Sequence, residues 1–69
     1  MQLTIPQSTL VKKAEYVGEV LTLEFTRGGT YQYDNVRGFL VAAMTMTDSV
    51  GSFFQRFIKH RFPYRKISE

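Results

Sequence analysis

The side chains that could perform catalysis are few and lie far apart along the chain. His60 is the only histidine, and it lies in a basic stretch with no carboxylate close to it in sequence. A side-chain nucleophile needs a base within hydrogen-bond reach and usually a third group that orients the base. Asp34 and Asp48 precede segments with helical spacing, where a carboxylate is expected to cap the helix. We therefore predict that the protein binds a partner and is not an enzyme.

Metal and cofactor sites are not expected either. The chain contains no cysteine, and its sequence offers no cluster of the three or four ligands that a metal site needs. Gly28-Gly29 is too short to cradle a phosphate, and it joins two expected strands instead of opening a helix. No apolar run approaches the roughly 20 residues that span a bilayer, and the N-terminus lacks the pattern of a signal peptide. We therefore expect a cytoplasmic protein without a cofactor or a metal.

Aromatic and basic residues together indicate a binding site. Two tyrosines alternate in Tyr31-Gln32-Tyr33, and a strand would place both on one face of a sheet. The net charge is +3, and residues 55–69 carry five Lys or Arg against Glu69 alone. Sites for single-stranded nucleic acid combine cationic grooves with aromatic rings on which the bases stack. The expected binding residues for RNA or single-stranded nucleic acid are Tyr31, Tyr33, Lys13, Arg56, Lys59, Arg61, Arg65 and Lys66.

Other interpretations of these residues stay open. The basic segment could be a solvated helix face that only aids solubility, and the tyrosines could be core residues. An acidic protein surface or a ribonucleoprotein would also suit Tyr and Arg, which dominate protein interfaces. The chain would then be a protein-interaction module or an inhibitor, encoded for example by a phage or another mobile element. An exposed strand edge would also allow a homodimer.

Alternating apolar and polar residues predict three strands near the N-terminus. The expected strands are residues 10–17, 20–26 and 30–34, with residues 64–67 as a further short strand. A type II′ turn at Gly18-Glu19 should join the first two strands, because a two-residue turn with glycine first suits that geometry. This turn sets Lys13 opposite Glu24, which is a favourable cross-strand pair.

The turn between the second and third strands decides where the two tyrosines lie. A two-residue turn near Gly28 places Tyr31 and Tyr33 on the polar face of the sheet, together with Lys13. A three-residue turn with a bulge places both tyrosines on the apolar face, which carries Leu21. A slip of one residue moves every side chain of the strand to the other face. The sequence leaves both registers open.

Two segments with helical spacing follow the strands. The first helix should be capped by Asp34 or Asn35, with an apolar face of Val36, Phe39, Leu40 and Ala43. The second should be capped by Asp48 or Ser49, with an apolar face of Val50, Phe53, Phe54, Phe57 and Ile58. It should end near Arg61, because the residue before Pro63 avoids helical angles.

These elements predict a single domain over residues 1–69 with an α+β fold. The expected architecture is a three- to four-stranded antiparallel meander followed by two C-terminal helices packed on one face. A short domain of this kind buries a limited apolar area, so its stability should be modest.

The motifs taken together resemble the KTSC domain. The matching residues are Ser8-Thr9-Leu10, Tyr16, Leu23-Glu24-Phe25, Gly28, Tyr31-Gln32-Tyr33, Val36, residues 49–54, Ile58 and Tyr64-Arg65-Lys66-Ile67. Two positions depart from the family pattern: Arg37 stands where proline is frequent, and Gln55 where asparagine is common. The family is named for its place at the C-terminus of some lysyl-tRNA synthetases and also includes small standalone proteins. The resemblance implies a standalone member, and the synthetase context implies RNA binding.

Overall fold

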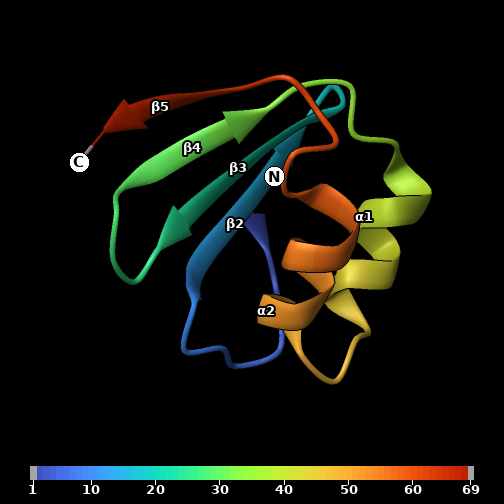
Figure 1. Cartoon of the computed structure of the whole chain (residues 1–69). Coiled ribbons are helices and arrows are strands. Elements are labelled where there is room, and N and C mark those ends of the chain that lie inside the picture. Colours follow the sequence, from blue (N-terminus) through green and yellow to red (C-terminus); the bar gives the residue numbers. More distant parts are fainter. Residues whose placement is uncertain (1, 69) are drawn as a thin grey trace.

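The computed structural model describes residues 2–68, which form a five-stranded antiparallel sheet with helices on one of its faces (Figure 1). In sheet order the strands are β1 (Gln2–Leu3), β2 (Val11–Val17), β3 (Val20–Phe25), β4 (Thr30–Tyr33) and β5 (Tyr64–Ser68). Between β4 and β5 in sequence lie α1 (Gly38–Thr45) and α2 (Val50–Phe53), and α2 continues as the π-helical η1 (Phe54–Ile58). The predicted α+β class is confirmed. The sheet has five strands instead of three to four, because β1 adds to the meander and the C-terminal strand pairs with β4.

The first hairpin has the predicted register. Val17 pairs with Val20, and Lys13 pairs with Glu24. The turn type differs from the expected II′ form. Both turn residues have positive φ, 54° at Gly18 and 67° at the glutamate that follows it, which defines a type I′ turn.

A bulge in β2 explains its imperfect alternation of apolar and polar residues. The pairing with β3 shifts between Val11 and Lys13, so Lys12 is the extra residue. Val11 and Ala14 can therefore both be buried, although they are three positions apart. The ion pair with Glu24 comes from Lys12, whose Nζ lies 3.8 Å from the carboxylate.

The register between β3 and β4 places both tyrosines on the apolar face. Tyr33 lies opposite Leu21, and Tyr31 lies opposite Leu23. Gly28 in the connecting turn has a φ of 103°, a conformation that glycine adopts without steric cost. Of the two registers that the sequence leaves open, the bulged alternative is therefore the one that forms.

The first helix begins later than predicted because the chain before it is bonded to the first hairpin. The amide of Val36 donates to the carbonyl of Glu19 at 2.9 Å, and the hydroxyl of Tyr16 donates to the carbonyl of Val36. The helix starts only at Gly38, and its N-cap is Arg37, which makes no side-chain capping bond. The prediction of a cap at Asp34 or Asn35 is thus wrong.

The later start changes which face of α1 is buried. Val41 and Met44 contact the core, whereas the predicted core residues Phe39 and Ala43 are exposed. Leu40 is half-buried. The predicted apolar face is therefore right for Val36 and Leu40, which contact the core, and wrong for Phe39 and Ala43. An apolar outer face remains on the surface.

The second helix has the predicted cap and an earlier end. The Ser49 hydroxyl accepts a hydrogen bond from the amide of Ser52 at 3.2 Å. At the other end, the amide of Lys59 donates to the carbonyl of Phe54, five residues earlier, at 2.8 Å. This wide turn closes the helix at Ile58 instead of near Arg61, and the chain then leads through a left-handed residue toward β5.

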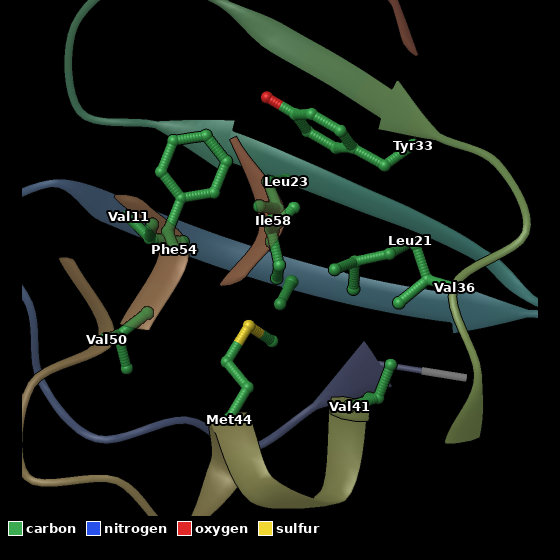
Figure 2. Packing of buried hydrophobic residues seen from close by; sticks show 11 residues of the cluster. Val11, Leu21, Leu23, Tyr33, Val36, Val41, Met44, Val50, Phe54 and Ile58 are labelled. Carbon is green, nitrogen blue, oxygen red and sulfur yellow. The ribbon is translucent and has the colours of Figure 1, made fainter. Parts of the chain in front are cut away.

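The hydrophobic core lies between the sheet and the helices, as Figure 2 shows. Its largest fully buried side chains are Leu21, Leu23, Met44, Ile58, Val11, Val36 and Val50. Phe54 and Tyr33 close the core toward β4 and β5, with only 6% and 5% of their surfaces exposed. Within residues 2–68, no helix has the length and apolar composition needed to cross a bilayer.

Candidate functional site

A hollow of about 220 Å³ opens on the helix side of the sheet, where the C-terminal end of η1 faces β4 and β5. Its lining consists of Tyr31, Tyr33, Phe54, Lys59, His60 and Tyr64, and we call it the tyrosine hollow. Strand pairing builds one wall, since Tyr64 lies opposite Tyr33 and Lys66 lies opposite Tyr31. The early end of the helix builds the other wall, because it leaves Lys59 and His60 beside the rings.

The floor of the hollow and the wall formed by β4 and β5 are aromatic. The ring centroids of Tyr31 and Tyr33 are 6.4 Å apart with a 28° angle between the planes, and those of Tyr33 and Tyr64 are 5.7 Å apart. Phe54 meets Tyr33 edge to face at 5.7 Å and supports it from the core side. Exposure rises from 5% at Tyr33 to 54% at Tyr64. The hollow therefore has a fixed aromatic floor and an accessible aromatic rim.

Tyr33 supplies a neutral hydroxyl to this floor. Burial raises the pKa of Tyr33 to about 12, and the neighbouring phenols of Tyr31 and Tyr64 add to the increase. The hydroxyl makes no hydrogen bond to another residue in the described part of the chain. At neutral pH it can therefore donate a hydrogen bond to an acceptor that enters the hollow.

The raised pKa predicts that alkali destabilises the fold. In the unfolded chain Tyr33 ionises near its ordinary pKa of 10.0, whereas the folded domain keeps it neutral until about pH 12. The unfolded state binds fewer protons in this interval, so the free energy of unfolding decreases as the pH rises through it. Urea unfolding at a series of pH values measures the decrease. The Tyr33→Phe variant should show a smaller one, and an equal decrease in both proteins would contradict the assignment to Tyr33.

Two of the predicted basic residues lie at or beside the hollow. Lys59 lines it, and the Lys66 Nζ lies 5.9 Å from the centroid of the Tyr31 ring. That distance permits an attraction between the cation and the electron-rich face of the ring. The C-terminal strand thus brings a cation and an aromatic side chain to the same rim.

Two other predicted residues lie on the opposite, uncovered face of the sheet. Lys13 pairs with Glu24 there, and Arg65 donates two hydrogen bonds of 3.2 and 3.0 Å to the Gln32 side chain. The two-residue turn that would place Lys13 on the same face as the tyrosines does not form, so the bulged register leaves Lys13 on the other face of the sheet.

Arg56 and Arg61 form a separate basic pair outside the lining of the hollow. The Arg61 Nε donates to the carbonyl of Arg56 at 2.9 Å, and the Arg56 guanidinium lies 5.6 Å from the centroid of the Phe57 ring. Both residues are exposed. They can add to the positive potential near an approaching ligand without contacting the tyrosines.

The uncovered face of the sheet also carries a hollow, but its chemistry does not suit an anion. This hollow has a volume of about 270 Å³ and is lined by Gln2, Lys13, Ala14, Glu15, Thr22, Glu24 and Thr30. Its two carboxylates oppose a phosphate, and among residues 2–68 Lys13 is the single cationic side chain of its lining. We therefore take the tyrosine hollow as the candidate site, although it is the smaller of the two.

The sequence prediction missed part of this site. Tyr64 was not assigned to the site, although it lies in the predicted C-terminal strand, two positions before Lys66. Pairing that strand with Tyr31-Gln32-Tyr33 would have brought Tyr64 beside the other tyrosines. His60 is considered in the sequence only as a catalytic candidate, and its place beside the hollow depends on a φ of 64° that no sequence pattern indicates.

The chain belongs to the KTSC domain family. The model of this family, described as the KTSC domain, matches residues 7–62, which confirms the resemblance seen in the motifs. A crystal structure of a KTSC domain protein from Yersinia pestis is similar, with a TM-score of 0.88 and 29% identity. The alignment covers 97% of this chain and 96% of that one.

Curated relatives place a similar segment within larger enzymes. Two lysine–tRNA ligases, from Trichormus variabilis and a Nostoc species, are 31% and 32% identical to this chain over 65 residues. The alignments cover 91% of this chain and 12% of each enzyme. The similarity thus defines a shared domain and does not extend to most of the ligase sequence.

Proposed function

We propose that this KTSC domain binds single-stranded RNA by stacking a base in the tyrosine hollow, and that it catalyses no reaction. The observation that carries the proposal is the convergence of three tyrosines and Lys59 around one opening. Stacking of a base on an aromatic side chain contributes about 1–3 kcal/mol and accepts any base. The domain is therefore expected to bind with little sequence preference.

The size of the hollow suits a single base. Clefts that enclose a whole drug-sized ligand have volumes of about 300–1,000 Å³, whereas the tyrosine hollow has about 220 Å³. The Tyr31 and Tyr64 rings contact each other, with centroids 5.9 Å apart. One ring system can therefore stack on the accessible side of Tyr64, which is 54% exposed, while the backbone to which it is attached stays outside. The neutral hydroxyl of Tyr33 can then donate to a ring nitrogen or carbonyl of the base.

The charges at the rim suit the phosphates on either side of that base. Lys59 and Lys66 stand beside the opening, and no carboxylate belongs to its lining within residues 2–68. The exposed Arg56 and Arg61 add positive potential farther along the same helix end. A bound strand can follow this row of cations, since phosphate contacts supply most of non-specific affinity.

RNA is favoured over DNA by the relatives. The two similar enzymes are named as ligases that act on tRNA. The shared segment is a small part of those enzymes, so the ligase reaction is not transferred to this chain. The inference for this chain is limited to the kind of partner, which is RNA.

A salt series with two matched variants tests the proposal. Lys66→Gln and Arg65→Gln remove the same charge at adjacent positions, but only Lys66 is on the side of the hollow. In a titration of labelled single-stranded RNA, Lys66→Gln should lower the dependence of log affinity on log salt by about one, and Arg65→Gln should change it less. Equal effects of the two variants would contradict the hollow as the site. Absence of RNA binding at low salt would instead favour an acidic protein as the partner.

A further inference from the structure

The outer face of α1 exposes an apolar stripe. Its members are Phe39, Ala42, Ala43 and Met46, all exposed, with 76% of Phe39 and 82% of Met46 accessible. The inner face of the same helix is also apolar, since Val41 and Met44 are buried. A helix that is apolar all round is normally enclosed on both sides. The stripe therefore indicates a missing neighbour.

The stripe has the same order of side-chain sizes in both directions. Two large residues, Phe39 and Met46, flank two small ones, Ala42 and Ala43, with spacings of three, one and three. When two such helices cross antiparallel between the alanines, each Phe39 meets the Met46 of the other copy. The alanines then allow the two backbones to approach closely. Such self-complementarity is what a two-fold symmetric interface requires.

Charged residues beyond both ends of the stripe fit the same arrangement. Arg37 directly precedes α1, and Asp48 lies three residues beyond its last residue, Thr45. Both are exposed, and neither forms an ion pair with another residue in the described range 2–68. In the antiparallel crossing, Arg37 of each copy approaches Asp48 of the other. The symmetry therefore produces two complementary charge pairs.

We propose that α1 is the contact of a homodimer, in which two copies of this chain pack their α1 helices antiparallel. The proposal does not depend on RNA binding. Figure 1 shows α1 and β5 on opposite sides of the molecule, so the tyrosine hollow of each copy stays open. An eight-residue helix buries less than the roughly 1,200–2,000 Å² of a standard interface, so the dissociation constant should be on the order of 10–100 µM.

Exchange of the two charges tests whether the partner is a second copy. Sedimentation of the protein from about 1 µM to 1 mM should reveal a monomer–dimer equilibrium. Arg37→Asp and Asp48→Arg should each raise the dissociation constant by about ten-fold, because each places two like charges opposite one another. An equimolar mixture of the two variants should restore the original affinity, since both pairs regain opposite charges. Arg27→Asp makes the same charge change in the β3–β4 turn and should change the constant by about two-fold or less.

Two results would overturn the proposal. One is a protein that stays monomeric up to the highest concentration, which would mean that the stripe faces a different partner. The other is a dimer whose dissociation constant does not respond to the charge changes or whose variants do not recover when mixed. Circular dichroism of each variant, at concentrations where it is monomeric, establishes that it is folded.

Discussion

Phe54→Ala should cost about 3–5 kcal/mol of stability, as expected for removal of a large buried side chain. The whole free energy of unfolding of a 69-residue domain is roughly 3–10 kcal/mol, so the variant should lose a large fraction of it and unfold at a much lower urea concentration. The loss is large because Phe54 packs against two other rings in the core. Its ring centroid lies 5.1 Å from that of Phe25 and 5.7 Å from that of Tyr33. Urea unfolding followed by circular dichroism measures the loss.

Phe39→Ala is the matched control, because it removes the same side chain from an exposed position. Its effect on stability should stay within about 0.5 kcal/mol when it is measured at low micromolar concentration. A Phe54→Ala variant that keeps its stability but loses RNA affinity would contradict the placement of Phe54 in the core. It would instead make Phe54 a ligand contact.

Tyr64→Ala should weaken RNA binding by about 1–3 kcal/mol, which is roughly 5- to 150-fold, because it removes the accessible stacking ring. The fold should survive, since Tyr64 is 54% exposed on an edge strand. Fluorescence anisotropy with a labelled single-stranded RNA gives the affinity.

Tyr64→Phe separates stacking from hydrogen bonding at the same position. It keeps the ring and should retain most of the affinity that Tyr64→Ala loses. If Tyr64→Ala binds as tightly as the original protein, no base stacks on this ring. An equal loss in both variants would instead assign the contribution to the hydroxyl.

The first hairpin was predictable because several local signals agree on it. The Gly18-Glu19 turn, the apolar alternation of β3 and the Lys13–Glu24 pair all indicate one register, and the structure has it. Agreement of this kind is what makes a local prediction dependable. The turn subtype escaped prediction, since positive φ at a glutamate is not indicated by its residue type.

The start of α1 was not predictable because it is set by contacts between distant residues. The bonds from Val36 to Glu19 and from Tyr16 to Val36 hold the chain against the first hairpin. Helical spacing includes Val36 in the helix, yet these tertiary bonds exclude it and rotate the buried face. Local periodicity contains no information about such bonds.

The sequence indicates several residues of the candidate site, but it does not indicate how they are arranged on the sheet. Tyr31 and Tyr33 were identified as a pair, but the side on which they lie depends on one residue in the β3–β4 turn. The alternative that places them on the apolar face implies that they are core residues. In the structure both tyrosines border a hollow on the helix side of the sheet. The helix ends at Ile58 and therefore does not extend over this end of β4 and β5.

Backbone amide chemical shifts during a titration with a short single-stranded RNA test the central claim most directly. We predict that the largest changes occur at Tyr31, Lys59, Tyr64 and Lys66, around the tyrosine hollow. The uncovered face of the sheet should change little. Shifts centred instead on Lys13, Glu15 and Thr22, which line the hollow of that face, would contradict the account.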